Sequence, residues 1–291
     1  MDAVSLAGRL ENAPYHAGLG VRVETVESDR VCLRLPYRDE NSNPGQALHG
    51  GVLASLIGIA GGAAAWTGIE ERPGLETSTL DLTVNYLAAA IGEAVVATAD
   101  VLRRGKEIVY SQVDVRTDAG KRIAAGLVTF RAFDRAANPA AADRQQTTAA
   151  RPVDLREKIR GADLFVAAPF IGRLGMTVDA AHGGESVLSM PFRPELADGS
   201  GAVHEGALAA LIDTTGALAS WSLTGLNMRF KASTVGIHAN YHAPAEGEDV
   251  VAHAATLRRN NEIFLNQVTV SGRTSGAVVA TGSVTYRIVV D

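Results

Sequence analysis

The stretch that decides the fold is HGGVLASLIGIAGGAAAW, residues 49–66, which carries no charged side chain. The uncharged run continues to Ile69, and its twenty residues from Gly50 are enough to span a bilayer. Most of them are Gly and Ala, however, and side chains this small favour transfer into lipid only weakly. A helix that is apolar on nearly all sides is more often buried in a protein core. We therefore expect a central buried helix and no membrane partner.

A second stretch of the same kind, HEGALAALIDTTGALASW, occupies residues 204–221, at an offset of 155 residues from the first. The same offset pairs uncommon residues along most of the chain: His49 with His204, Trp66 with Trp221, Asn85-Tyr86 with Asn240-Tyr241, and Glu107-Ile108 with Glu262-Ile263. Chance does not hold a register over so many rare residues. The sequence is therefore an internal duplication.

The duplication divides the chain into two predicted domains, residues 1–133 and 153–291, with a linker over 134–152. The linker is rich in Ala, Gln, Thr and Pro and has no periodic apolar face. Residues 153–165 carry Leu155, Ile159 and Leu164 at helical spacing, which predicts a short amphipathic helix opening the second copy.

The order of elements within a copy predicts the fold class. In the first copy, alternating apolar residues predict strands over 21–26, 30–35, 79–87, 93–102, 108–116 and 122–133, with the uncharged helix between the second and third strands. Two strands, one helix and four strands indicate an antiparallel sheet around one buried helix. We expect an α+β fold, built twice.

Composition excludes several classes of function. A net charge of -5 gives no electrostatic footprint for nucleic acid, and 46% hydrophobic residues exclude a disordered chain. A single cysteine, Cys32, excludes a disulfide framework, and the histidines show no metal-ligand spacing. This spacing leads us to expect no metal site. No secretory signal is visible in residues 1–10, so we expect a cytoplasmic protein.

The start of the uncharged helix carries a recognisable motif. His49-Gly50-Gly51 opens the helix, Asn43 lies six residues earlier, and Asn85-Tyr86 lies on the following strand. This arrangement resembles the PaaI-type hotdog thioesterases, and the resemblance covers both copies. It implies a tandem hotdog fold that forms an internal pseudo-dimer, hydrolysis of acyl-coenzyme A thioesters without a separate cofactor, and a homodimer of the two-domain chain.

The resemblance also implies roles for single residues. In the family, an asparagine and the backbone N–H of the glycine after the histidine hold the thioester carbonyl. A carboxylate nine residues after the histidine activates water or attacks directly. The first copy has Asn43, His49 and Gly50 at these positions, but Gly58 where the carboxylate is expected.

The second copy has the opposite defect. Asp213 stands at the carboxylate position, but Asp198 replaces the asparagine and Glu205 replaces the glycine. Nine helical residues at about 1.5 Å each place Asp213 roughly 13 Å from the start of its own helix, too far to act on the same carbonyl. The carboxylate of one copy must therefore face the helix N-terminus of the other. We expect one competent site per chain, made of Asp213 with Asn43, His49 and Gly50.

Each of these residues also has a purely structural interpretation. His49 could be a loop histidine bonded to backbone groups, and Asn43 lies in an Asn-Pro-Gly turn sequence. Gly51, which we predict to line the substrate site, could serve only close helix packing. Asp213 lies among apolar neighbours, where burial would raise its pKa and make it a better base.

Two basic pairs occupy the same predicted hairpin in both copies. Arg103-Arg104 and Arg258-Arg259 could bind the phosphates of coenzyme A, because guanidinium groups pair well with phosphate. Solvated turn charges are the alternative interpretation.

The sequence thus predicts an acyl-CoA thioesterase. One alternative is a non-catalytic acyl-CoA-binding hotdog protein, since each copy has lost part of a site. A less favoured alternative is an enoyl-thioester hydratase, because Asp198 and His204 fit the expected hydration pair poorly.

Overall fold

The computed structural model describes residues 2–134, 149–150, 153–227 and 229–289. Most of the predicted linker, 134–152, lies outside the described residues. Its first residue, Asp134, ends strand β6. In the first copy the elements are α1 (Ala3–Asn12), α2 (Pro14–Leu19), β1 (Arg22–Glu27), β2 (Arg30–Leu35), η1 (Asp39–Asn41), α3 (Gly50–Trp66), β3 (Leu75–Tyr86), β4 (Val95–Arg104), β5 (Ile108–Thr117) and β6 (Arg122–Asp134).

The second copy repeats this order. Its elements are α5 (Ala162–Phe165), α6 (Pro169–Leu174), β7 (Thr177–His182), β8 (Glu185–Met190), η2 (Pro194–Leu196), α7 (Glu205–Thr224), β9 (Lys231–Tyr241), β10 (Val250–Asn260), β11 (Ile263–Gly272) and β12 (Val278–Val289). The prediction of two strands, one long helix and four strands, made twice, is confirmed.

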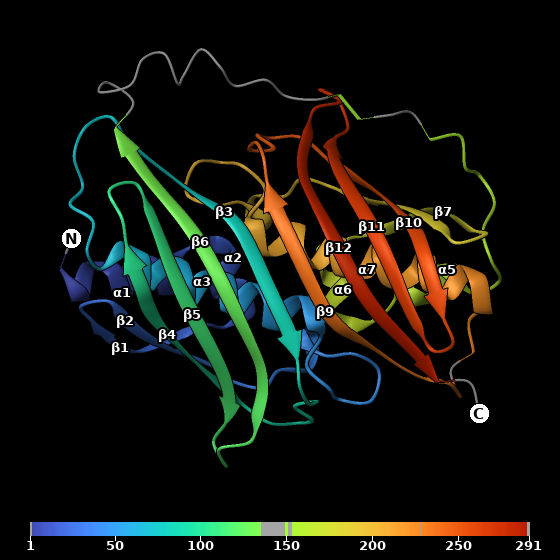
Figure 1. The fold of residues 1–291 in the computed structure, drawn as a ribbon, viewed down its shortest axis with the longest axis horizontal. Helices are drawn as coiled ribbons and strands as arrows, with labels where there is room; N and C mark the ends of the chain where they lie inside the picture. The colour runs from blue at the N-terminus through green and yellow to red at the C-terminus, as the bar shows by residue number, and fades with distance from the viewer. Residues whose placement is uncertain (1, 135–148, 151–152, 228, 290–291) are drawn as a thin grey trace.

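All twelve strands form one antiparallel sheet in the order β1-β2-β4-β5-β6-β3-β9-β12-β11-β10-β8-β7. The two halves join where β3 pairs with β9, from Asp81 opposite Asn240 to Asn85 opposite Gly236 (Figure 1). β3 and β9 would each be an unpaired edge strand if their copy stood alone. Because the two strands pair with each other, no edge is exposed at the centre of the sheet.

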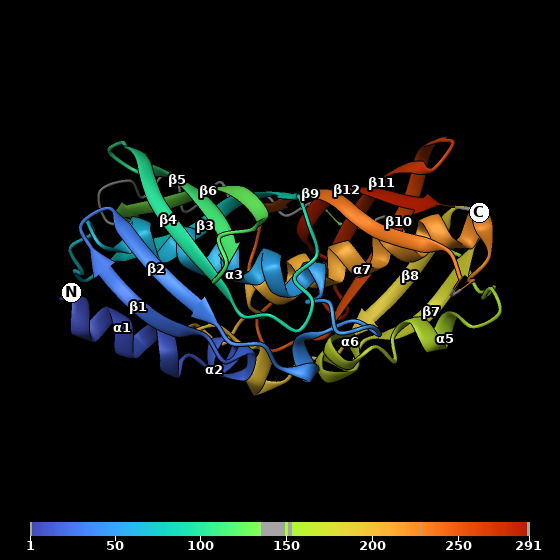
Figure 2. The same ribbon diagram turned by 90° about the horizontal axis from the view of Figure 1, so that it is seen from below.

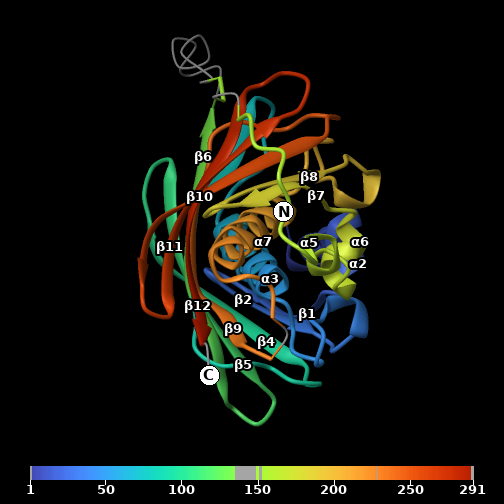
Figure 3. The same cartoon turned by 90° about the vertical axis from the view of Figure 1, so that its right-hand side faces the viewer.

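The two long helices lie inside the curve of this sheet. Seen from below, α3 and α7 meet at the centre of the molecule (Figure 2). The short helices α2, α5 and α6 lie on the side away from the sheet, so the long helices are enclosed between two layers (Figure 3). Among the described residues, no helix has the length and hydropathy needed to cross a membrane.

Glycines set how closely the two helices approach. A Cβ added to Gly51 would lie 2.6 Å from Cβ and 2.8 Å from Cα of Ala210, and one added to Gly206 would lie 2.7 Å from Oγ of Ser55. Contacts under 3 Å are not tolerated between backbone-anchored atoms. The first turn of each helix therefore packs directly on the second turn of the other. The four residues obey the same 155-residue offset that revealed the duplication.

One predicted element is wrong. Only Ala162–Phe165, within the predicted helix over 153–165, is helical. The backbone before it bonds to a strand instead of forming helical hydrogen bonds, since the Ile159 N–H donates to the carbonyl of Ala181 on β7. Gly161 adopts a left-handed φ of 84°, just before the short helix begins. Pairing with a strand edge outweighed the helical spacing of the apolar residues.

The close helix contact predicts opposite effects for two glycine substitutions. Gly51→Ala pushes α3 away from the backbone of α7, and we expect it to lower the free energy of unfolding by about 1–3 kcal/mol. Gly62→Ala is the control, because its added methyl group would meet nothing closer than the Phe130 ring at 3.8 Å. That change should be neutral or stabilise by roughly 0.5–1 kcal/mol. Equal effects of the two changes in denaturant unfolding would contradict the packing described here.

Candidate functional site

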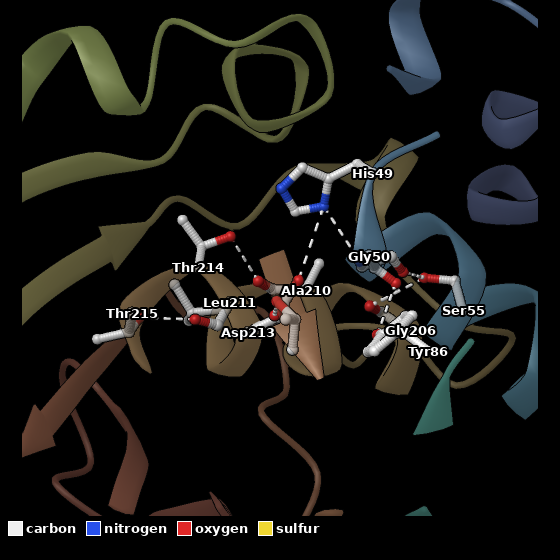
Figure 4. Close-up of polar contacts among 12 residues, drawn as sticks. His49, Gly50, Ser55, Tyr86, Gly206, Ala210, Leu211, Asp213, Thr214 and Thr215 are labelled. Atoms are coloured by element: carbon white, nitrogen blue, oxygen red, sulfur yellow. Dashed lines mark hydrogen bonds and ion pairs between the residues drawn. The ribbon is translucent and has the colours of Figure 1, made fainter. Parts of the chain in front are cut away.

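A buried carboxylate from one copy lies against the helix start of the other. Asp213 on α7 is 3% exposed. Its Oδ2 lies 2.7 Å from the position that a Cβ of Gly50 would occupy. Any larger residue at position 50 would displace the carboxylate. The close-up shows the Asp213 side chain of α7 near His49 and Gly50 at the start of α3 (Figure 4).

His49 holds the start of α3 and is uncharged. Its Nδ1 accepts the N–H of Gly51 at 2.9 Å, which satisfies one of the free donors of the first helical turn. An accepting Nδ1 carries no proton, so the proton of the neutral ring lies on Nε2. Burial lowers the pKa of His49 to about 4. The 3.9 Å approach of Nδ1 to Oδ2 of Asp213 is therefore a contact and not an ion pair.

The N–H of Gly50 is the free donor of this site. As the first residue of α3, it has no intrahelical acceptor, and no acceptor for it occurs elsewhere in the described chain. The hydroxyl of Tyr86 donates to the Gly50 carbonyl at 2.8 Å and fixes this residue from the β3 side. The positive end of the α3 dipole and an available N–H thus lie beside a carboxylate.

Thr234 on β9 positions the carboxylate. Its Oγ1 donates to Oδ1 of Asp213 at 2.6 Å. Burial raises the pKa of Asp213 to about 6, and the hydrogen bond from Thr234 opposes part of that rise. The sequence pattern alone indicates no role for Thr234 or Tyr86 in the site. The signal available was their place in the repeat, where Thr79 pairs with Thr234 and Tyr86 with Tyr241.

Asn43 lies in the loop before α3, in a tight turn. Its N–H donates to the Ala47 carbonyl at 2.8 Å and its carbonyl accepts the Gln46 N–H at 3.2 Å. The side chain is half-buried, and its amide has no hydrogen-bond partner in the described residues. The structure therefore brings together His49, Gly50 and Asp213, whereas it shows no contact that joins the Asn43 amide to them.

The second interface repeats this architecture with a different carboxylate. Nδ1 of His204 accepts the N–H of Gly206 at 2.9 Å, and the hydroxyl of Tyr241 donates to the Glu205 carbonyl at 3.1 Å. Glu205 takes the place of Gly50, and its Oε1 accepts the backbone N–H of Thr79 at 3.1 Å. Burial raises the pKa of Glu205. Gly58 stands where the equivalent of Asp213 would be, so this interface has no carboxylate from the middle of α3.

A cavity of about 460 Å³ opens at this second interface. It runs along α3 and is bounded by α1, by strands of the first copy and by the start of α7. Its lining includes Leu10, Ser55, Ile59, Trp66, Phe130 and Glu205.

Asp198 occupies the position in the second copy that Asn43 has in the first, and its side chain bonds to residues of its own loop. Its Oδ1 accepts the N–H of Ser200 at 2.7 Å, the Ser200 hydroxyl at 2.7 Å and the N–H of Ala202 at 3.1 Å. It also borders the cavity. Its role in the fold is that of a turn-forming side chain.

The basic pairs lie at hairpins distant from Asp213. Arg104 pairs with Asp29 at 2.6 Å and donates to the Ala65 carbonyl at the far end of α3, about 22 Å along the helix from Gly50. Arg259 donates to the Asn261 carbonyl at 3.2 Å. Arg103 and Arg258 are exposed. Arg104 thus has a structural partner at a helix C-terminus, and phosphate binding by these four residues stays a prediction.

The described residues contain no group of three or more His, Cys, Asp or Glu side chains placed to hold a metal ion. The site described above offers a carboxylate, a free N–H and a neutral histidine.

Two solved structures share the fold across nearly the whole chain. A hot dog fold protein of Alicyclobacillus acidocaldarius superposes with a TM-score of 0.64, at 17% identity, covering 92% of this chain and 96% of that one. An acyl-CoA thioesterase II of Mycobacterium marinum gives a TM-score of 0.63, at 14% identity, with the same coverage. These likenesses establish a tandem hotdog fold.

Each of three relatives in sequence matches less than half of this chain. A protein of Halobacterium salinarum is 35% identical over 124 residues, 40% of this chain and 82% of that protein. Human acyl-coenzyme A thioesterase 13 is 32% identical over 99 residues, 33% of this chain and 69% of its own length. A medium/long-chain acyl-CoA thioesterase of Escherichia coli is 27% identical over 146 residues, 44% of this chain and 93% of its own length.

The family model described as the thioesterase superfamily matches residues 45–124 and again residues 200–286. Each match contains one long central helix and the strands that follow it. With both halves matched, this chain belongs to the thioesterase superfamily.

Proposed function

We propose that the chain is an acyl-CoA thioesterase that hydrolyses an acyl-coenzyme A thioester to a free acid and coenzyme A. The observation that carries the proposal is the Asp213 carboxylate of α7 lying against Gly50, the first residue of α3. The human and Escherichia coli relatives, both named acyl-CoA thioesterases, support the same reaction and the same substrate class.

We assign each group a step in this reaction. Asp213 takes a proton from a water molecule, whose oxygen attacks the thioester carbonyl carbon. The oxyanion that forms accepts the N–H of Gly50 at the positive end of α3, and the amide of Asn43 is its second donor. Loss of one such donor typically costs about 3–4 kcal/mol in the barrier. When the intermediate collapses, the carbon–sulfur bond breaks and the thiolate leaves with the proton held by Asp213.

His49 and Thr234 act on the site without taking part in proton transfer. A neutral His49 that caps α3 through Nδ1 fixes the direction of the Gly50 N–H. Thr234 fixes the rotamer of Asp213 through Oδ1 and leaves Oδ2 facing the helix start. Gly51 contributes close helix packing, and its N–H is already used by His49.

The arrangement of the copies supports an internal pseudo-dimer. Pairing of β3 with β9 and the contact of α3 with α7 bring the two halves of a site together in one chain. We also propose that two chains associate, as the family resemblance implies, and that the protein is cytoplasmic.

The second interface is proposed to be catalytically silent. Glu205 and Asp198 place two acidic side chains near the start of α7, where the first interface has Gly50 and Asn43. An oxyanion would be repelled there. A hydratase is not favoured, because Asp198 is held in its own turn by three hydrogen bonds.

Replacing the carboxylate tests the assignment. We expect Asp213→Asn to lower kcat by a factor of about 10²–10⁴, as for loss of a general base, when free thiol release is followed with short, long and aromatic acyl-CoAs. The exposed Asp163→Asn is the control and should keep full activity. Hydrolysis that survives Asp213→Asn would place the chemistry elsewhere.

The same substitution should not weaken the fold. A pKa raised from 3.8 to about 6 means that the ionised Asp213 destabilises the native state above pH 6, by roughly 3 kcal/mol at full ionisation. Asp213→Asn should therefore raise the free energy of unfolding at pH 8, and the gain should disappear as the pH falls below 4. Denaturant unfolding at both pH values measures it. A lower free energy of unfolding for Asp213→Asn than for wild type at pH 8 would contradict the claim that the ionised, buried Asp213 destabilises the fold.

The pKa of Asp213 also predicts the pH dependence of catalysis. Only the ionised carboxylate accepts a proton, so kcat/KM should rise with pH through an apparent pKa of about 6 and then level off. Thr234→Val removes the hydrogen bond that stabilises the charged form, and we expect it to move this rise to higher pH. The equivalent change in the other copy, Thr79→Val, should leave its position unchanged. A rise that stays near pH 6 in Thr234→Val would mean that another group titrates.

A further inference from the structure

We propose that the cavity at the second interface, bounded by α1, α3 and the start of α7, is a second binding site for a linear acyl chain, where the ligand is held without being hydrolysed. The cavity lies at the interface that lacks the Asp213 equivalent, so this site is additional to the proposed hydrolytic one. Binding there is measured without turnover and does not depend on the proposed function.

The size and lining of the cavity fit an apolar chain. Its volume of about 460 Å³ falls in the range of about 300–1,000 Å³ typical of small-molecule sites. From Ser55 to Trp66 the lining follows α3 for about 16 Å. Most side chains along this length are apolar, among them Leu10, Ile59 and Phe130, and Arg9 and Thr79 also contribute to the lining. A mostly apolar space of this length suits an alkyl chain better than a compact polar ligand.

Polar groups gather at the α7 end of the cavity. Glu205 enters it from α7, and His204 and His16 line the same end. The two rings are joined: Nε2 of His204 lies 2.9 Å from Nε2 of His16, whose Nδ1 lies 2.9 Å from the Leu10 carbonyl. Since Nδ1 of His204 accepts the Gly206 N–H, its Nε2 is the donor to His16, and both rings are neutral. Burial lowers the pKa of both histidines, in agreement with this assignment.

This end of the cavity is therefore suited to an uncharged polar head. The histidine chain ties α1 and α2 to the start of α7, so the cavity wall is fixed in place. Burial raises the pKa of Glu205, and its Oε1 accepts the backbone N–H of Thr79. An acyl thioester offers an uncharged carbonyl group at one end and an alkyl chain at the other.

Gly58 keeps the space open. A Cβ added to it would meet nothing closer than Cδ2 of Leu82, at 4.0 Å. At the mirrored interface the equivalent position carries Asp213.

The surroundings of the two tryptophans toward the C-terminal ends of α3 and α7 also differ. Trp221 is buried, and its ring stacks on that of Phe230 at a centroid distance of 6.3 Å. Trp66 is half-buried, and its ring lies 5.3 Å from the Arg9 guanidinium.

The second site holds a thioester without cleaving it for an electrostatic reason. The Glu205 side chain occupies the space beside the α7 N-terminus, and the charge of Asp198 raises its pKa further. A developing oxyanion would meet two acidic groups where hydrolysis needs donors.

The test counts bound ligands with a probe that cannot be hydrolysed. S-dodecyl-coenzyme A, a thioether, is titrated calorimetrically against the full chain. Tridecan-2-one, an uncharged ketone with a carbonyl group at one end of an alkyl chain, is titrated in a parallel arm. We expect two thioether molecules per wild-type chain and one per Gly58→Leu chain, because the new side chain fills the cavity. Gly8→Leu is the control, since Gly8 has no neighbour within 4 Å on exposed α1, and it should bind two.

The outcomes separate the possibilities. A single thioether site in wild type that persists in Gly58→Leu, with no tridecan-2-one site lost in that variant, overturns the proposal. A tridecan-2-one site that Gly58→Leu removes, without a second thioether site, supports the acyl-chain site and shows that the cavity binds the chain without the coenzyme. A second readout does not depend on Gly58: a tridecan-2-one chain with a terminal bromine should quench Trp66 fluorescence, and Trp66→Phe should remove that quenching. Quenching that is unchanged in Trp66→Phe would place the chain elsewhere.

Discussion

The close crossing of α3 and α7 is the constraint on which the rest of the structure depends. Gly51 lies against the backbone of Ala210, and no side chain fits between them. This contact sets Asp213, one turn further along α7, beside the first residue of α3. The carboxylate, the free Gly50 N–H and the histidine cap are all positioned by it. The continuous sheet holds the same register, because β3 and β9 pair across the same centre.

The crossing also explains why the two interfaces diverged as complementary pairs. At the first interface an aspartate at position 213 requires a glycine at position 50, because a Cβ there would meet the carboxylate. At the second, position 58 is glycine, and Glu205 accepts the backbone N–H of Thr79. Each interface therefore keeps one carboxylate from α7: the buried Asp213 from the middle of the helix in one case, and the half-buried Glu205 from its first residue in the other. Only the first leaves the helix N-terminus free for an oxyanion.

Much of this architecture could be predicted from the sequence, because duplication leaves a register that rare residues reveal. The 155-residue offset identified both helices, and helix geometry required Asp213 to face the other copy. Contacts made through space carry no such signal. Thr234 binding Asp213 and the chain of His204 and His16 depend on which side chains meet in three dimensions. The helix predicted over 153–165 is mostly absent for the same reason: its backbone forms hydrogen bonds with β7, a contact between segments that the local sequence does not reveal.

The central claim is that hydrolysis needs a carboxylate from one copy and a free helix N-terminus from the other. The most direct test of this claim rebuilds the carboxylate, the glycine at the helix start and the asparagine at the second interface. In an Asp213→Asn chain, we would add Gly58→Asp, Glu205→Gly and Asp198→Asn and measure free thiol release from acyl-CoAs. The account predicts that hydrolysis returns, and that the same chain without Gly58→Asp stays inactive. Hydrolysis in the absence of Gly58→Asp, or none by the complete set in a chain that folds, would contradict it.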